Sequence, residues 1–229
     1  MGLNKQKGNM YGFVTHTWNV VKGKCPHDCS YCYMKRFPLK EIRFDEKELK
    51  TDLGSGNYIF VGSSCDMFAE DIPLDWIMKI VAHCKKYPEN KYLFQSKNPK
   101  RFWDITWSDY PDDSVFCTTV ECDHTESFSK APSAFHRCKW LQQIPRPFKK
   151  MITIEPIIDF NLTAMTNLIK LASPDYVNIG ADSKHSGLPE PSEDKVKDLI
   201  KVLEGCSEIT LKKNLKRITG EGHEIASDN

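Results

Sequence analysis

The chain has 229 residues, of which 40% are hydrophobic and 28% charged, and its formal net charge at pH 7 is +1. This composition is ordinary for a soluble globular protein, and the near-neutral charge excludes the strongly basic balance of many nucleic-acid-binding proteins. No apolar run approaches the ~20 residues of a membrane-spanning helix, and the N-terminal segment lacks the apolar core of a signal peptide. We therefore expect a cytoplasmic protein with one domain over residues 1–229 and no contact with a membrane.

Seven short segments rich in Val, Ile, Phe and Tyr, bounded by Gly, Pro, Asp or Ser, predict β-strands. In chain order they are His16–Val21, Tyr58–Gly62, Lys91–Gln95, Ser114–Thr119, Met151–Glu155, Tyr176–Gly180 and Glu208–Leu211. Between them lie segments whose apolar residues recur with the helical period.

The clearest predicted helix is Asp71–Cys84, with Asp71 as its N-cap and Pro73 in its first turn. Further helices are expected after Pro132, after Asn161 and after Ser192. Strands that alternate with helices indicate parallel pairing. We therefore predict an α/β fold, a partial (β/α)6 TIM-like barrel with parallel strands, because a complete eight-unit barrel needs about 250 residues.

Basic side chains gather in three short runs, for which a solvated surface is the preferred interpretation and a phosphate-binding face the alternative. The runs are Lys97, Lys100 and Arg101; Lys149 and Lys150; and Lys212, Lys213, Lys216 and Arg217.

Three of the nine cysteines, Cys25, Cys29 and Cys32, lie within eight residues, directly after the first predicted strand. Spacings of three and then two residues allow one loop to place three thiolates around one metal centre. Thiolates are the usual ligands of iron–sulfur clusters. With only three of them, a four-iron cluster keeps one iron open for a substrate.

Two alternatives to an iron–sulfur cluster are a zinc site and three unrelated buried cysteines. Structural zinc prefers four ligands, and His27 is available as the fourth, although it lies inside the loop between Cys25 and Cys29. The sequence has no second Cys-x-x-Cys pair, and chance spacing of this kind is uncommon. The sequence therefore favours an open [4Fe-4S] cluster.

The pattern Cys25-x3-Cys29-x2-Cys32, followed by Tyr33, resembles the signature of the radical-SAM superfamily. The resemblance implies a partial (β/α)6 barrel whose first loop carries the cluster, with S-adenosylmethionine (SAM) bound to the open iron. It also implies a one-electron donor such as flavodoxin or ferredoxin. The electron cleaves SAM to methionine and a 5′-deoxyadenosyl radical, which abstracts hydrogen from a substrate.

Within the superfamily the chain resembles two groups. One is spore photoproduct lyase, which repairs a thymine lesion in DNA; this likeness covers the cysteine loop and a few strand ends. The other is an uncharacterised family of short phage-associated and bacterial proteins of radical-SAM type, and this likeness covers nearly the whole chain. It is carried by the motifs at Val61–Phe68, Thr119–Glu121, Ile154–Pro156 and Asn178–Gly180.

The lyase likeness implies SAM-binding roles for residues near the cluster loop. Tyr31 and Tyr33 are expected on the adenine side of SAM, with packing beneath the cluster as the alternative. Gly62–Asp66 stands where the superfamily has a Gly-rich run that meets the SAM amino group. Ser64 and Asp66 are therefore expected to contact SAM, and the alternative role of Asp66 is to cap the following helix.

Polar side chains also end the third and fourth predicted strands. Lys97 is placed to pair with the SAM carboxylate. Thr118, Thr119 and Glu121 are placed to bond the ribose or the methionine part of SAM. The alternative for all four is a polar side chain that faces solvent where a strand ends.

Two residues are candidates for catalysis. Glu155 follows an apolar predicted strand, where an unpaired buried carboxylate is costly, so it either contacts substrate or pairs with a neighbouring lysine. Cys65 either donates a hydrogen atom to a product radical, as a cysteine does in the lyase, or is a buried apolar cysteine. Ser63, and not Cys65, aligns with the lyase's cysteine.

The sequence thus predicts a radical-SAM enzyme whose substrate is unidentified, with a nucleic-acid base or nucleotide as the first hypothesis. That hypothesis rests on the lyase likeness and the basic runs. A small molecule or a peptide is the next choice of substrate. The alternative from another functional class is a metal- or cluster-stabilised nucleic-acid-binding module without turnover.

Overall fold

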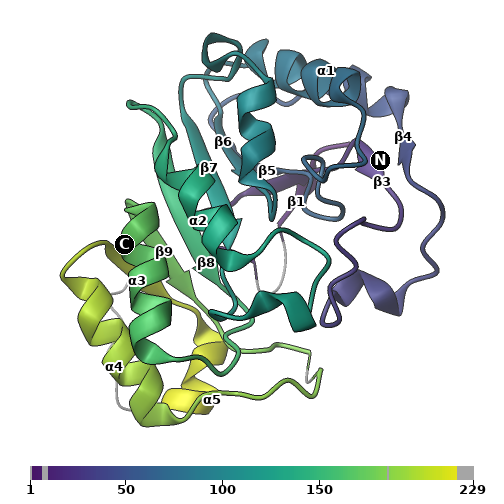
Figure 1. The fold of residues 1–229 in the computed structure, drawn as a ribbon. Coiled ribbons are helices and arrows are strands. Elements are labelled where there is room, and N and C mark those ends of the chain that lie inside the picture. Colours follow the sequence, from purple (N-terminus) through teal and green to yellow (C-terminus); the bar gives the residue numbers. More distant parts are fainter. Residues whose placement is uncertain (1, 7–9, 185, 221–229) are drawn as a thin grey trace.

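The computed structural model describes residues 2–6, 10–184 and 186–220, and within them eight strands form one open sheet (Figure 1). Seven of these strands are parallel, and β1 pairs with β2 in the antiparallel sense. In sheet order the strands are β1 (Asn4–Lys5), β2 (His16–Trp18), β5 (Tyr58–Val61), β6 (Lys91–Gln95), β7 (Ser114–Thr119), β8 (Lys149–Ile154), β9 (Tyr176–Ile179) and β10 (Glu208–Leu211). The predicted α/β partial barrel with parallel strands is confirmed.

Each predicted strand segment coincides with or overlaps one of the parallel strands, but β8 begins at Lys149, two residues before the predicted Met151, and the first segment is divided. Strand β2 ends at Trp18, and Val21 belongs to β3 (Val21–Lys22), which pairs with β4 (Arg43–Phe44) in a separate two-stranded sheet. The loop with the three clustered cysteines therefore leaves from β3 and returns through β4.

Helices follow most of the parallel strands and cover one face of the sheet (Figure 1). The α-helices are α1 (Leu74–Lys85), α2 (Ala134–Gln142), α3 (Leu162–Ala172), α4 (Glu193–Glu204) and α5 (Lys216–Thr219). The 3-10 helices are η1 (Tyr33–Arg36), η2 (Glu46–Lys50), η3 (Pro99–Asp104), η4 (Trp107–Asp109), η5 (Thr125–Ser127) and η6 (Lys213–Leu215). Helices α3 and α4 begin where predicted, and the side chains of Asn161 and Ser192 cap them.

Helix α1 begins three residues later than the sequence predicts. Pro73, and not Asp71, occupies the capping position, and no side chain caps the helix there. A proline disfavours helical backbone at the residue before it, so Ile72 stays outside the helix. The predicted cap at Asp71 is therefore wrong.

Side chains along the strands alternate between the two faces of the sheet. On the outer face Ile59, Phe94, Phe116 and Ile152 pack beneath the helices in the main core. On the inner face a second, smaller apolar cluster consists of Tyr11, Val14, Phe60, Leu93, Val115, Cys117 and Met151. Further along the strands the inward positions are polar, with Gln95 on β6 and Thr119 on β7. The interior of the partial barrel is thus apolar at one end and polar at the C-terminal ends of the strands.

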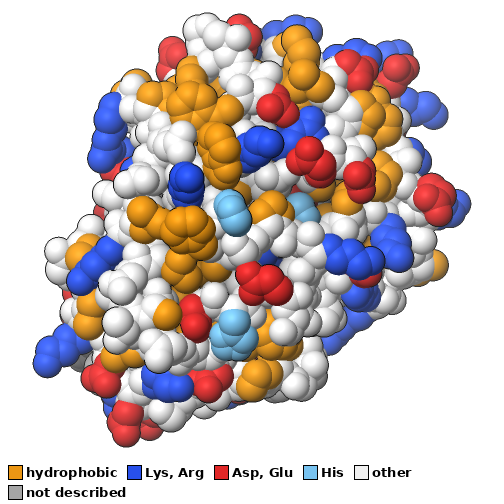
Figure 2. All heavy atoms as spheres, viewed as in Figure 1, with side chains coloured by type: hydrophobic (Ala, Val, Ile, Leu, Met, Phe, Trp, Pro, Cys, Tyr) orange, Lys and Arg blue, Asp and Glu red, His pale blue; other side chains and the backbone are white. Residues whose placement is uncertain are grey.

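Acidic and basic side chains are interspersed over the face of the molecule seen in Figure 2, as the net charge of +1 leads one to expect. No helix within the described residues is long and apolar enough to cross a membrane.

Candidate functional site

A cavity of about 660 Å³ opens at the C-terminal ends of the parallel strands. The end of every parallel strand contributes to its wall, through Asn19 (β2), Gly62 (β5), Gln95 and Lys97 (β6), Thr119 (β7), Glu155 (β8), Ala181 (β9) and Lys212 (β10). Parallel α/β folds bind their ligands at this edge of the sheet. The cavity is therefore the candidate site.

Cys25, Cys29 and Cys32 all line this cavity, and none of them forms a disulfide. Two tight turns shape their loop: the N–H of Asp28 donates to the Cys25 carbonyl, and the N–H of Cys32 donates to the Cys29 carbonyl, each at 3.2 Å. Asp28 has a φ of 45°, a left-handed conformation that aspartate tolerates better than most residues. The three thiols thus share one wall, as their spacing predicts.

A segment after β7 packs against the cysteine loop. The Ser129 hydroxyl lies 3.2 Å from the Cys29 sulfur and 3.2 Å from the His27 carbonyl oxygen, to which it donates. The N–H of Lys130 donates to that carbonyl at 2.8 Å, and the N–H of Ser30 donates to the Phe128 carbonyl at 2.8 Å. This segment holds the loop against the barrel.

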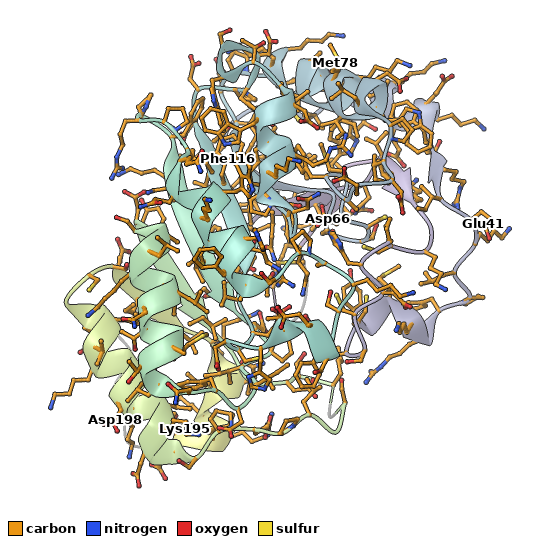
Figure 3. The ribbon with its side chains drawn as sticks, viewed as in Figure 1. Glu41, Asp66, Met78, Phe116, Lys195 and Asp198 are labelled. Atoms are coloured by element: carbon orange, nitrogen blue, oxygen red, sulfur yellow. The ribbon has the colours of Figure 1, made fainter. Side chains whose placement is uncertain are left out.

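Asp66 lies beside the strand ends in the middle of the molecule (Figure 3), and its carboxylate accepts hydrogen bonds from four donors. Oδ2 accepts hydrogen bonds from His27 Nε2 (2.8 Å), Ser96 Oγ (3.0 Å) and the N–H of Lys97 (2.8 Å), while Oδ1 accepts from the N–H of Phe68 (2.9 Å). Burial alone would raise the pKa of Asp66, but His27 lowers it below its usual value. His27 is therefore paired with Asp66, which weakens the case for it as a fourth zinc ligand.

Cys65 is buried beside Cys25, and their thiols are hydrogen-bonded. This bond lowers the pKa of the Cys25 thiol below its usual value. The bond and burial together raise the pKa of Cys65 above its usual value. The lowered pKa favours the thiolate at Cys25, the form in which a cysteine binds a metal.

Tyr31, Lys97 and Glu121, predicted from three separate segments as SAM contacts, meet in one place. The Tyr31 hydroxyl and Lys97 Nζ both donate to Glu121 Oε1, and Lys97 Nζ also donates to the Tyr31 oxygen. Tyr31 and Lys97 line the cavity, whereas Glu121 lies behind them, 1% exposed, and pairs with Arg137. Glu121 therefore supports the cavity wall from behind, whereas the sequence predicted that it would contact the ligand.

Thr118 likewise does not reach the cavity. It is fully buried, and its hydroxyl donates to the Ser96 carbonyl at 2.7 Å. Because side chains alternate along a strand, its neighbour Thr119 lines the cavity instead. Of the two threonines predicted to contact SAM, Thr118 faces the core and only Thr119 reaches the cavity wall.

Ser64 and Tyr33 lie on the cavity wall where the sequence places them. Asn19 organises this part of the wall: its Oδ1 accepts hydrogen bonds from the Ser64 N–H (2.9 Å), the Ser64 hydroxyl (3.0 Å) and the Ser63 hydroxyl (3.2 Å). The Tyr33 hydroxyl donates to the Ser63 carbonyl at 3.2 Å.

Glu155 lies on the cavity wall and pairs with a lysine. The ion pair confirms the predicted lysine partner, whereas contact with a substrate stays a prediction. Glu155 Oε2 is 2.7 Å from Lys212 Nζ, which lies 5.3 Å from the centre of the Tyr11 ring.

Three members of the basic runs are buried, namely Arg101, Lys150 and Lys212. The interpretation of these runs as solvated surface is wrong for those three.

The donor set fits an iron–sulfur cluster by its chemistry, because thiolates are the usual ligands of such clusters. Among the described residues, no three His, Cys, Asp or Glu side chains are arranged to share one metal ion. Nη2 of the fully buried Arg137 has no hydrogen-bond partner within the described part, and this guanidinium interacts electrostatically with Cys29. A buried donor without a hydrogen-bond partner is rare. A negatively charged group bound to Cys29 would give the Arg137 guanidinium a favourable electrostatic partner.

Four residues that shape the site were not predicted from the sequence. They are Asn19, Ser129, Arg137 and Lys212. Only Lys212 carries a local signal, since it follows a predicted strand in the same way as Lys97. The other three have no motif around them.

The fold has known counterparts among solved structures. A mutant of spore photoproduct lyase with dinucleoside spore photoproduct superposes with a TM-score of 0.69 at 9% identity, over 92% of this chain and 81% of that chain. A double mutant of the lyase with bound AdoMet and dinucleoside spore photoproduct gives 0.67 at 9% identity, over 91% and 80%. The lyase complexed with dinucleoside spore photoproduct gives 0.68 at 9% identity, over 90% and 79%. At this identity the likeness shows a shared fold.

Among curated proteins no sequence matches the chain. A family model matches residues 10–189, which include the cysteine loop and most of the cavity wall. The chain therefore belongs to the family described as "Protein of unknown function (DUF5131)".

Proposed function

We propose that this protein is a radical-SAM enzyme that holds a [4Fe-4S] cluster on Cys25, Cys29 and Cys32. The observation that carries the proposal is their position, because three free thiols line one wall of a cavity at the C-terminal ends of a partial parallel barrel. Spore photoproduct lyase, whose fold the chain shares, has been determined with bound AdoMet. That structure supports the same use of the cavity here.

When bound, the cluster supplies the electron that splits SAM into methionine and a 5′-deoxyadenosyl radical, which takes a hydrogen atom from the substrate. Lys97 Nζ, on the cavity wall, suits the SAM carboxylate as a charge-assisted donor. Tyr33 and Ser64 offer hydroxyl groups to the adenosine part of SAM. Asp66 acts chiefly by holding His27, since four donors already occupy its carboxylate.

Cys65 remains the candidate hydrogen-atom donor to a product radical. Its S–H bond would break as the new C–H bond forms, and one electron and a proton would then restore the thiol. A cytoplasmic one-electron donor such as flavodoxin or ferredoxin would provide both this electron and the one used on SAM. Glu155, on the same wall, is the proposed polar contact to the substrate.

We infer a nucleotide or nucleic-acid base as the substrate class. The lyase has been determined with a dinucleoside substrate, which supports this class. The cavity wall of this chain also carries the exposed lysines Lys5 and Lys184, which suit the phosphate of such a ligand. The association with phages stays a prediction from the sequence resemblance.

The experiment compares the EPR spectrum of the dithionite-reduced, reconstituted protein with and without SAM. A change on adding SAM is expected if one iron is open to it. Cys29→Ala should lose the cluster signal, whereas Cys206→Ala removes an exposed cysteine at the N-terminal end of β10 and should behave as wild type. A spectrum unchanged by SAM, or a full signal in Cys29→Ala, would overturn the proposal.

A further inference from the structure

A charged group next to the cysteine loop has two members on the cavity wall, Tyr31 and Lys97, and two buried behind it, Glu121 and Arg137. These four residues are here named the Glu121 group. Glu121 Oε2 is 2.8 Å from Arg137 Nη1, and Glu121 Oε1 accepts hydrogen bonds from Lys97 and Tyr31. The side chains of Glu121 and Arg137 are 1% and 0% exposed.

The Glu121 group carries one more positive charge than negative. Lys97 and Arg137 contribute two positive charges, Glu121 contributes one negative charge, and the Tyr31 phenol is a neutral donor, which leaves +1. Burial alone would raise the pKa of Glu121, but the two cations beside it hold that pKa well below its usual value. Burial alone would lower the pKa of Arg137, but Glu121 raises it. Glu121 and Arg137 therefore both stay charged at neutral pH.

The position of Arg137 is fixed independently of the cavity. Its Nε donates to the Pro132 carbonyl at 2.6 Å and its Nη1 to the Thr119 carbonyl at 3.0 Å, so the guanidinium cannot turn toward solvent. Its Nη2 has no partner within the described residues. The same guanidinium interacts electrostatically with Cys29, and Tyr31 follows that cysteine by two residues. The charge of Arg137 is thus held near a proposed cluster ligand and screened from water, while Lys97 carries its charge on the cavity wall.

We propose that the Glu121 group sets the reduction potential of the bound cluster, with Arg137 and Lys97 raising the potential and Glu121 limiting that rise. Reduction adds one negative charge to the cluster, and a fixed positive charge nearby stabilises the reduced form. In a low-dielectric interior such an interaction is much stronger than in water. Net charge and hydrogen bonding around a cluster are established determinants of its potential.

This inference rests on the proposed function and is tested by an EPR-monitored redox titration of the reconstituted cluster without SAM. Glu121→Gln preserves shape and removes the negative charge, so its midpoint potential should rise. Arg137→Gln removes a positive charge, so its potential should fall. Arg137→Lys keeps the charge and should stay nearer to wild type than Arg137→Gln.

The control is Arg146→Gln, which removes one positive charge just before β8, about 20 Å from the cavity end of that strand at ~3.3 Å per residue. Its potential should not move. If Arg137→Gln fails to hold a cluster, Lys97→Gln supplies the same loss of charge and should lower the potential.

A midpoint potential that rises in Glu121→Gln and falls in Arg137→Gln would support the inference. A purely structural disturbance would not depend on the sign of the charge that is removed. Potentials that move in the same direction, or that match wild type, overturn the inference. A wild-type protein that binds no cluster would instead contradict the proposed function, so the two failures are distinguishable.

Discussion

Lys212 Nζ lies 2.7 Å from Glu155 Oε2, and the two side chains meet directly over Gly180. Glu155 follows β8, Lys212 follows β10, and Gly180 follows the strand between them, β9. The ion pair therefore joins two strand ends across a third. The strand β10 extends the predicted six-unit barrel and brings Lys212 to the cavity.

Replacing Gly180 by alanine should disturb this pair. A Cβ at position 180 would lie 3.0 Å from Glu155 Cδ and from Lys212 Cδ, closer than ordinary contact. Overpacking of this kind costs about 1–3 kcal/mol, measured as the free energy of unfolding in urea. Gly12→Ala is the control, because nothing lies within 4 Å of its added Cβ, and it should cost nothing. Equal effects of the two substitutions would contradict the packing described for Gly180.

Removing the Ser129 hydroxyl should loosen the cysteine loop. The hydroxyl contacts the Cys29 sulfur, the His27 carbonyl and the N–H of Ala131, and unsatisfied buried groups cost about 1–3 kcal/mol. Ser129→Ala should therefore lower the free energy of unfolding by that amount and speed loss of the reconstituted cluster to a chelator. Ser127→Ala, two residues away and exposed, should change neither. A Ser129→Ala protein as stable as wild type would show that the contact is incidental.

Lys97→Met should weaken SAM binding. The substitution removes a charged donor from the cavity wall, and a hydrogen bond to a charged group contributes about 1.5–3 kcal/mol. The dissociation constant of SAM should therefore rise by about tenfold or more, measured by calorimetry on the reconstituted protein. Lys100→Met removes an exposed lysine three residues away that is not on the wall and should leave the affinity unchanged. Equal dissociation constants for SAM in the two variants would show that Lys97 does not contact SAM.

Asp175, at the opposite end of the strands, gives a prediction for pH. Burial alone would raise its pKa, but bonds from the N–H of Lys150 and from Arg146 and Lys149 lower it below the usual value. A lowered folded-state pKa stabilises the protein above the unfolded pKa of about 3.9, and the contribution is lost as pH falls through the folded value. Asp175→Asn should cost about 1–2 kcal/mol at pH 7. Its deficit should stay constant down to about pH 5 and shrink below about pH 4; a deficit that is independent of pH would contradict the assignment.

The parallel sheet was predictable because each strand is a short apolar segment between turn-forming residues. No pattern in the sequence marks β1, since Asn4 and Lys5 are polar and exposed and join β2 through backbone pairing and a bond from the Asn4 amide to the Thr17 carbonyl. The connection between β6 and β7 contains 3-10 turns and no α-helix, and none was predicted there. Helix α1 starts later than its apolar period predicts because Pro73 disfavours helical backbone at Ile72.

The cysteine loop was predictable because its ligands are neighbours in sequence. The residues that hold it were not, because they come from distant segments. Ser129 is 100 residues from Cys29, Lys212 is 57 residues from Glu155, and Arg137 is 16 residues from Glu121. Their roles exist only once tertiary contacts have formed, and no local sequence pattern predicts such contacts. For the same reason Glu121 and Thr118 were expected at the cavity wall, although the fold places them behind it.

The most direct test of the central claim is whether the protein cleaves SAM. The protein is purified without oxygen, reconstituted with iron and sulfide, and given dithionite and SAM, and 5′-deoxyadenosine is measured by mass spectrometry. We expect 5′-deoxyadenosine from the wild type and none from Cys29→Ala. A colourless protein with stoichiometric zinc, or a brown one that forms no 5′-deoxyadenosine even when offered nucleotides and DNA, would contradict it.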